Sequence, residues 1–405
     1  MFMLPSMWRR AARVPLPLIM LSVASLQPVL AGPNIVGAGL TSEFLADSKV
    51  AMQSTNVRND NDVLLSFATV GDSRAEEGAA ELTAQDKIWL QNTPVITRIA
   101  REVEHQRPNF FFFNGDMIMG YKTDSNYLNR QYAFWRGMMS GLLESGTYLI
   151  PVPGNHEVQE KTKDPATGKT VKLARQSNED AWRANMGDLI IDATRWNRLL
   201  GESPGAWSVE NTPTVGGPDG ITTDQRQLSY SFDFRQAHFT VINTDAVGQD
   251  GRAPVQWLAQ DLAAAQQRGA KYFFVFGHKP AYSYKYSASM TKIEGFDQFP
   301  DNQKAFWDLM EQYSATYFCG HQHIFHIEQP RAADGGHAYQ VLVGSGGSPL
   351  DSPAGETSVA TDHMYAWVGV ELMRAGELRL TAYGFDEPRG PARPIEVIKL
   401  PAIAQ

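Results

Sequence analysis

The sequence has almost no cysteine, no excess of basic residues, and no long apolar run beyond its first 31 residues. Its single cysteine, Cys319, excludes an internal disulfide, so stability must come from the core and from any bound metal. The 36 Lys and Arg residues are outnumbered by 44 Asp and Glu residues, which argues against a nucleic-acid-binding surface. The rest is ordinary: 405 residues with 43% hydrophobic and 20% charged content predict a globular protein with a large core.

Residues 1–31 have the pattern of a signal peptide. Three arginines precede an apolar stretch at 14–26, and small residues end at Ala31. We expect cleavage after Ala31, which would remove the three arginines, take the formal charge from −8 to −11, and release a periplasmic or secreted protein. The stretch is shorter than the roughly 20 residues of a spanning helix, so no stable membrane span is expected after cleavage; an uncleaved anchor is the alternative. Residues 32–60 are expected to form a lead segment.

Five apolar runs each end in polar residues beside a glycine. The runs, expected to be strands, are residues 63–70, 110–113, 148–152, 272–276 and 316–318. Helical patterns lie between them, at 126–143, 254–267 and 302–313. Alternating strands and helices predict an α/β protein, in which ligands bind outside the carboxyl ends of the strands. The polar residues that follow the five runs are therefore expected to converge at one edge.

These polar residues are types that bind metal. They are Asp72, Asp116, Asn155, His156, His278, His321 and His323. Carboxylate, amide and imidazole groups suit Zn, Mn or Fe, and two such ions about 3.5–4 Å apart can clamp a phosphoryl group. Taken singly, each residue has a structural explanation, such as a capping aspartate or a buried histidine. Their shared position after a strand favours a metal site, whereas histidines without a motif, such as His238, are expected to be structural.

Five motifs in order carry a family resemblance. They are Asp72-Ser73-Arg74, Gly115-Asp116, Gly154-Asn155-His156-Glu157, Gly277-His278 and Gly320-His321-Gln322-His323. The order resembles the calcineurin-like phosphoesterase family, whose signature is D-x-H, G-D, G-N-H-D/E, a separate His, and G-H-x-H. Four of the five blocks match fully, and the match spans residues 66–323. Similarity to the purple acid phosphatases is more distant, because Met119 stands where they carry a tyrosine ligand, and Tyr121 could serve only with a different loop path.

The resemblance implies a four-layer α/β/β/α sandwich with two mixed β-sheets. Residues 61–405 would form one metallophosphoesterase domain, with a lid-like insertion at 158–227 that controls substrate choice. The strand-rich C-terminal third would complete the second sheet. We expect the tryptophans of the insertion to wall the substrate pocket; they are Trp182, Trp196 and Trp207.

The resemblance also implies a role for each motif residue. Asp116 would bridge two metal ions, with Asp72 and His323 on the first ion and Asn155, His278 and His321 on the second. His156 would assist the leaving group, oriented by Glu157. The implied activity is hydrolysis of a small phosphate ester by a metal-bridging hydroxide. The alternative is a non-catalytic metal- or phosphate-binding module on the same fold, because the first motif is altered.

That alteration is Arg74, which stands where relatives carry a histidine. A guanidinium is always charged and has no acceptor lone pair, so Arg74 cannot be a metal ligand. It would either turn outward and pair with Glu76 or Glu77, or reach into the site and bind substrate phosphate oxygens with both arms of its fork. We favour the second, because a phosphate needs cationic neighbours in so acidic a protein.

Overall fold

The computed structural model describes residues 62–76, 83–285, 293–352, 360–386 and 390–402. The expected signal peptide at 1–31, the lead segment at 32–60 and Glu77 lie outside these residues. Within them, no helix is both long and apolar enough to cross a membrane.

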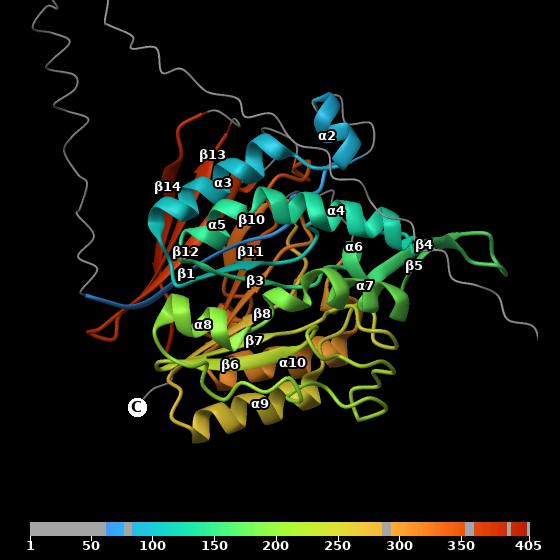
Figure 1. Cartoon of the computed structure of the whole chain (residues 1–405). Coiled ribbons are helices and arrows are strands. Elements are labelled where there is room, and N and C mark those ends of the chain that lie inside the picture. Colours follow the sequence, from blue (N-terminus) through green and yellow to red (C-terminus); the bar gives the residue numbers. More distant parts are fainter. Residues whose placement is uncertain (1–61, 77–82, 286–292, 353–359, 387–389, 403–405) are drawn as a thin grey trace, which may run out of the picture. The chain divides into compact units, whose positions relative to one another are not determined.

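The first sheet has six strands in the order β14-β13-β12-β1-β2-β3 (Figure 1). Their bounds are β1 Val63–Val70, β2 Phe110–Phe113, β3 Tyr148–Pro151, β12 Tyr365–Met373, β13 Leu378–Phe385 and β14 Arg393–Lys399. β1, β2 and β3 run parallel, whereas β12, β13 and β14 add antiparallel neighbours on the other side of β1. The sheet is therefore mixed, and its C-terminal strands extend it at the β1 side. The expectation that the C-terminal strands complete the second sheet is thus wrong for β12, β13 and β14, because they pair with β1 and with each other.

The second sheet also has six strands, in the order β10-β11-β9-β8-β7-β6. Their bounds are β6 Tyr230–Phe234, β7 Ala237–Val241, β8 Tyr272–Phe276, β9 Thr316–Cys319, β10 Phe325–Glu328 and β11 Tyr339–Val343. The four inner strands are parallel, and the edge strands β6 and β10 are antiparallel to their neighbours. Both sheets end their parallel strands at the same edge of the molecule, where the sequence places the five motifs.

Helices cover the outer face of each sheet (Figure 1). Figure 1 shows α3, α4 and α5 on one side of the strands and α9 and α10 on the other, so the four-layer sandwich is confirmed. The α-helices are α2 Ala84–Trp89, α3 Thr93–Gln106, α4 Ser125–Met138, α5 Ser140–Glu144, α6 Asn155–Val158, α7 Gln176–Met186, α8 Ala193–Leu200, α9 Val255–Gln267 and α10 Pro300–Gln312. The 3₁₀ turns are η1 Gly187–Leu189, η2 Phe296–Gln298, η3 Ala332–Asp334 and η4 Ala360–His363.

Helix α3 shows how the sequence builds this layer. Its buried positions recur at helical spacing, with Ile96, Ile99 and Val103 on the face toward the strands. Proline in its first turn suits the helix start, where no backbone N–H is needed, and the helix ends at Arg107 in the left-handed conformation. Burial of this apolar stripe against the first sheet, rather than helix propensity alone, stabilises the helix.

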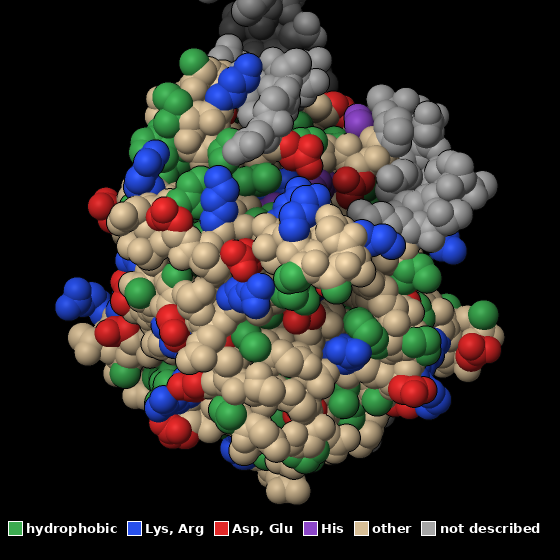
Figure 2. All heavy atoms as spheres, turned by 90° about the vertical axis from the view of Figure 1, so that its right-hand side faces the viewer, with side chains coloured by type: hydrophobic (Ala, Val, Ile, Leu, Met, Phe, Trp, Pro, Cys, Tyr) green, Lys and Arg blue, Asp and Glu red, His purple; other side chains and the backbone are tan. Residues whose placement is uncertain are grey.

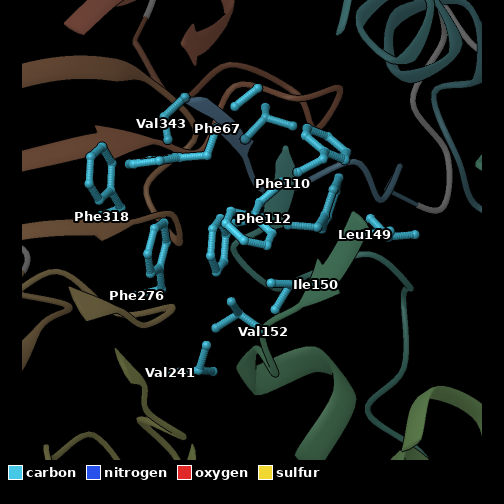
Figure 3. Packing of buried hydrophobic residues seen from close by; sticks show 14 of the residues in the cluster. Phe67, Phe110, Phe112, Leu149, Ile150, Val152, Val241, Phe276, Phe318 and Val343 are labelled. Atoms are coloured by element: carbon cyan, nitrogen blue, oxygen red, sulfur yellow. The ribbon is translucent and has the colours of Figure 1, made fainter. Parts of the chain in front are cut away.

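Aromatic side chains fill the space between the two sheets (Figure 3). The ring of Phe67 on β1 makes edge-to-face contacts with Phe112 of its own sheet and with Phe274 and Phe318 of the other, at centroid distances of 5.7, 4.9 and 5.5 Å. Phe112 stacks on Phe276 at 3.8 Å. Edge-to-face pairs add about 0.5–1.5 kcal/mol each beyond area burial, so this core fixes the strand ends that carry the site.

The insertion at 158–227 packs more of its bulk into this core than expected. It contains the hairpin of β4 (Gln159–Lys163) and β5 (Thr170–Ala174), followed by α7 and α8. Trp182 and Trp196 are completely buried in the main hydrophobic cluster, and Trp196 packs on Phe110 of β2 at 5.2 Å. The expectation that these tryptophans wall the pocket is therefore wrong. Trp207 also packs against the core. These large apolar rings are stabilised by burial in the core and not by exposure in a loop.

Candidate metal centre

Five strand ends from both sheets meet at one edge and bring the motif residues together. Asp72 follows β1, Asp116 follows β2, and Asn155 follows β3 in the first sheet, while His278 follows β8 and the His321–His323 pair follows β9 in the second. All of these side chains are buried except that of His321, which is half-buried. The alternation of apolar strand and polar end therefore positions each residue.

The backbone is unusual at three of these residues. Asp72, Asp116 and His321 have φ values of 61°, 53° and 74°, in the left-handed region that non-glycine residues seldom adopt. The backbone N–H of His321 donates to the Asp72 carboxylate at 3.0 Å, and that of Asp72 donates to the Gly115 carbonyl at 2.9 Å. These bonds hold the turns in place, and such strained conformations cluster at functional sites.

Glycines beside the motifs allow the loops to approach closely. A β-carbon at Gly154 would overlap the backbone nitrogen and carboxylate of Asp116, and one at Gly320 would overlap the Asp72 carboxylate. Neither position has room for a side chain, because the contacts would be shorter than real β-carbons make. The glycine in each motif is thus explained by crowding at the site.

Asp116, His278 and His321 form one group of possible metal ligands. Nε2 of His278 lies 3.1 Å from Oδ1 of Asp116 and 3.2 Å from Nδ1 of His321. Oδ1 of Asn155 lies 2.9 Å from Nε2 of His278 and 2.8 Å from Nδ1 of His321. Four possible ligand atoms therefore converge, three from strand ends and one from α6. A tetrahedral metal site requires four ligands.

Asp72, Asp116 and His323 form a second group, and Asp116 belongs to both. Nε2 of His323 lies 3.7 Å from Oδ1 of Asp72. Among the described residues these are the two groups of three in which all ligand atoms lie within 4.8 Å of one another. A carboxylate common to both is the arrangement that lets one side chain bridge two ions.

The tautomers of two histidines fit metal binding. Nδ1 of His278 lies 2.8 Å from the carbonyl oxygen of Asn114, and Nδ1 of His323 lies 2.9 Å from that of Pro349. A carbonyl only accepts, so each Nδ1 carries a hydrogen and each Nε2 is the nitrogen directed at the site. Nε2 of His278 and Nδ1 of His321 therefore converge with the oxygens of Asp116 and Asn155 around one point. The residues present therefore fit a metal.

Burial and mutual charge push the pKa values of the site apart. Burial raises the pKa of Asp72 well above its usual value. Burial acts the same way on Asp116, but its neighbours His156, His278 and Arg74 outweigh it and hold the pKa well below the usual value. For His278 burial is opposed by Asp116 and Asp72, which raise its pKa to about 10. Such divergence is typical of functional sites.

His156 lies beside both groups without joining either. Its Nδ1 lies 2.6 Å from the Met119 carbonyl oxygen, and its Nε2 is 3.6 Å from Oδ2 of Asp116. Burial, opposed by Asp116, lowers its pKa well below the usual value. The fixed Nδ1 leaves Nε2 as the nitrogen that faces the site.

Glu157 does not hold this imidazole, contrary to the sequence-based expectation. Its carboxylate accepts from the backbone N–H groups of Asp116, Ile118 and Gly154, at 2.9, 3.1 and 2.8 Å. Burial raises its pKa to about 7. The carboxylate therefore ties the loop after β2 to the loop after β3, and the backbone carbonyl of Met119 orients His156 in its place. Local motif spacing could not distinguish these partners.

Tyr121 is a site residue that the sequence did not assign. Its hydroxyl accepts a hydrogen bond from Nδ2 of Asn155, so Oδ1 of that amide faces the two imidazoles. Its ring also packs on His156, with centroids 3.8 Å apart. The signal that could have found it is the position of an aromatic residue directly after Gly120 in the loop that carries Asp116.

Arg74 points into the site. It is 7% exposed, and its Nη2 lies 3.2 Å from Nε2 of His323. Its Nε is 3.6 Å from Oδ2 of Asp116, and its Nη1 is 3.6 Å from Oε1 of the exposed Glu76. The guanidinium thus contacts His323 and Asp116 of the second ligand group. Its outer nitrogen, Nη1, lies near Glu76.

A cavity of about 190 Å³ gives access to the site. It is lined by Arg74, Glu76, Asp116, Tyr121, Asn155, His156, Lys172, Glu294, His321, His323 and Asp351. A neighbouring cavity of about 320 Å³ shares part of this lining and reaches Gln159, Lys279 and Phe299. Figure 2 faces the side of the molecule that carries the β4–β5 hairpin, and histidine side chains are visible there behind basic and acidic ones. The insertion reaches the cavities through Gln159 and Lys172 of this hairpin.

Comparisons with known proteins agree with the motif order. The family described as calcineurin-like phosphoesterase matches residues 85–325, a range that begins after the altered first motif. No curated protein matches the sequence.

Three solved structures resemble the chain at low identity. A purple acid phosphatase from yellow lupin (Lupinus luteus) seeds is 15% identical with a TM-score of 0.48, over 81% of this chain and 52% of that one. A dimetal phosphatase from Danio rerio is 14% identical, with a TM-score of 0.41 over 84% and 99%. GAP50, the anchor in the inner membrane complex of Plasmodium, is 14% identical, with a TM-score of 0.44 over 83% and 88%. The chain spans about half the length of the lupin protein.

Proposed function

The chain belongs to the calcineurin-like phosphoesterase family, and we propose that it hydrolyses a small phosphate ester with metal ions held at the converging strand ends. The observation that carries this proposal is the pair of ligand groups that share Asp116. A histidine cluster with a purely structural role does not require two such ligand groups side by side. A hydrolase that acts on a phosphoryl group through two cations does.

The two groups divide the proposed ligands. Asp72, Asp116 and His323 would hold one ion; Asp116, Asn155, His278 and His321 would hold the other. When bound, two ions (Fe, Mn or Zn) would supply a nucleophile from water that they share and neutralise charge on the phosphoryl oxygens. The chain's part is to fix these ligands through backbone carbonyls and the Glu157 carboxylate, so that little reorganisation is needed.

His156 is proposed to assist the leaving group. Its Nδ1 is fixed by the Met119 carbonyl, so Nε2 faces the cavity beside Asp116 and outside both ligand groups. Once Nε2 has taken up a proton, it can donate that proton to the departing oxygen or stabilise the negative charge there. Glu157 would support this role indirectly, by holding the two loops that carry Asp116 and His156.

The substrate side of the site combines cations with a small volume. Arg74 and Lys172 line the cavity of about 190 Å³ and would bind phosphate oxygens. The neighbouring cavity of about 320 Å³ would receive the organic part of the ester. The insertion would influence substrate choice through the β4–β5 hairpin, which supplies Gln159 and Lys172 to these walls.

Export is also proposed, from the pattern of residues 1–31. Basic residues, an apolar stretch and small residues before Gly32 support removal of a signal peptide and a periplasmic or secreted product. The mass of the protein recovered from an expressing host tests this. A chain beginning at Gly32 is expected, and a retained N-terminus would contradict the proposal.

Hydrolysis is tested with metal-loaded protein on an aryl phosphate and an aryl phosphodiester. Turnover with Mn, Zn or Fe is expected. Asp116→Asn should lose more than about 100-fold of it, because even residues that only support ligands cost 10–100-fold. Absence of turnover with every metal, while the wild-type protein still binds metal, would favour the non-catalytic binding module.

A further inference from the structure

Arg74 occupies the ligand group that lacks its expected histidine. Its Nη2 lies 3.2 Å from Nε2 of His323, the nitrogen whose lone pair faces the site because Nδ1 is bonded to Pro349. The same guanidinium lies 3.6 Å from the Asp116 carboxylate, and Asp72 is the other acid of the group. A cation is therefore already present among two carboxylates and an imidazole.

The guanidinium is not fully satisfied where it lies. In the part of the chain that the structure describes, its buried Nε–H has no hydrogen-bond acceptor. Its outer nitrogen Nη1 lies 3.6 Å from Glu76, whose side chain is 58% exposed. A buried donor without an acceptor costs free energy. The Glu76 carboxylate at the cavity mouth could pair with the guanidinium in a second, outward orientation of Arg74.

We propose that Arg74 is the resident cation of the Asp72–Asp116–His323 position and makes the two metal positions unequal. The proposal rests on the proposed function only in taking the two ligand groups as metal positions. The first ion binds at Asp116, Asn155, His278 and His321. Of these Arg74 lies beside Asp116, at 3.6 Å from Oδ2, while Oδ1 faces His278. A second ion needs the His323 lone pair that Nη2 contacts, so it enters only when the guanidinium turns toward Glu76.

Charge makes this competition strong. A divalent ion and a guanidinium a few Å apart repel each other, and a buried setting screens them poorly. The second ion is therefore expected to bind at least about tenfold more weakly than the first. An arginine at this position converts a pair of similar metal positions into a tight one and a weak one, filled in that order.

Calorimetric titration of metal-stripped protein with Mn²⁺ tests the proposal without measuring activity. The wild-type protein should show one tight ion and a second at least about tenfold weaker. Arg74→His and Arg74→Ala should each strengthen the second ion at least about tenfold. Two ions of equal affinity in the wild-type protein, or a second ion unchanged by both substitutions, would overturn it.

A variant at the cavity mouth acts in the opposite direction. Glu76 is exposed, so Glu76→Gln should fold normally and weaken the second ion about two- to fivefold, because the outward position loses its partner. Arg98→Ala, which removes an arginine paired with Glu102 on α3, is the matched control and should change neither ion. An unchanged second ion in Glu76→Gln would count against the outward position. If the wild-type protein binds no ion, the proposed function fails; if it binds two equally, only this inference fails.

Discussion

Two buried clusters of this protein contain histidine and two aspartates, and they differ in how their polar atoms are arranged. In the His238 cluster, both ring nitrogens meet carboxylates, Asp233 at 2.6 Å and Asp261 at 2.9 Å. In the metal centre, the inward nitrogens of His278 and His321 face each other at 3.2 Å. The residue types are the same. One imidazole paired with a carboxylate on each side makes a structural cluster, whereas ligand atoms that converge from several strand ends make a binding site.

The surroundings of the His238 cluster confirm its completeness. Asp261 also accepts from Ser231 at 2.6 Å and from Thr240 at 2.9 Å, and Asp233 accepts from Arg268 at 2.7 Å. The cluster joins β6 and β7 to α9. This network therefore contributes to stability, whereas the metal centre holds ligand atoms from several strand ends within reach of one another.

The largest predicted effect is on catalysis, at His156. His156→Ala should slow esters with poor leaving groups about 10²- to 10⁴-fold, because general-acid assistance is lost. Activated aryl esters should be affected much less. Steady-state kinetics across leaving groups, with metal content measured on each preparation, check this.

The exposed His337 supplies the control, and His337→Ala should leave both rates unchanged. Loss of metal from the His156 variant would show that this residue belongs to the ligand set, which would weaken the distinction between ligand and supporting group.

The next effect is on stability, at His238. His238→Phe should lower the free energy of unfolding by about 3 kcal/mol, because Asp261 loses a buried charged partner. The matched change at the metal centre, His321→Phe, should cost only about 1 kcal/mol in metal-free protein, because the half-buried His321 loses hydrogen bonds to Asn155 and His278 and no carboxylate partner. Urea unfolding of the two variants provides the comparison. Equal losses would contradict the contrast between the clusters.

The same cluster predicts a pH dependence. Burial lowers the pKa of His238, but hydrogen bonds to Asp233 and Asp261 outweigh it and raise the pKa above the usual value. A raised histidine pKa stabilises fully below the unfolded value of about 6.5 and loses that stabilisation as pH rises through the folded value.

The aspartates act at the other end of the range. The pKa values of Asp233 and Asp261 are lowered, despite burial, by the bonds to His238, so their stabilisation is lost as pH falls below about 4. The stability difference between wild-type and His238→Phe should therefore be largest between about pH 4 and 6.5 and shrink on either side. Urea unfolding at several pH values measures it, and a difference independent of pH would contradict a charged cluster.

A smaller effect is predicted for Tyr121, whose hydroxyl orients the Asn155 side chain of the metal centre. Tyr121→Phe removes the acceptor for the Asn155 amide, so its Oδ1 is no longer held toward His278 and His321. Affinity for the tighter ion should fall about 10- to 100-fold, as is usual for groups that orient ligands. Competition with a fluorescent chelator measures this.

Tyr132 is the matched control. Its buried hydroxyl has no hydrogen-bond partner among the described residues, so Tyr132→Phe should leave metal affinity unchanged. An equal loss in both variants would point to general loosening of the core and not to orientation of Asn155.

The sequence predicted the strands and their polar ends because both are local features. Runs such as 110–113 are short, apolar and aromatic, and a glycine follows in the turn after each, which together favour a buried strand. The same locality allowed the motif order to identify the family, which the match over residues 85–325 confirms.

Features that depend on distant contacts were not predictable in this way. Trp182 and Trp196 lie on α7 and α8 of the insertion, but their rings pack on residues far away in the sequence, Tyr132 of α4 and Phe110 of β2. The partners of Glu157 include backbone groups of another loop. The direction of the Arg74 side chain depends on the position of His323, which follows β9. Side-chain partners across loops are set by tertiary packing, which local spacing does not encode.

The central claim, two metal positions that share Asp116, is tested most directly by anomalous diffraction from crystals grown in excess Mn²⁺. Two anomalous peaks about 3.5–4 Å apart are predicted, both in contact with the Asp116 carboxylate. One peak should contact His278 and His321, and the other His323. A single peak that does not touch Asp116, or two peaks that share no ligand, would contradict the account.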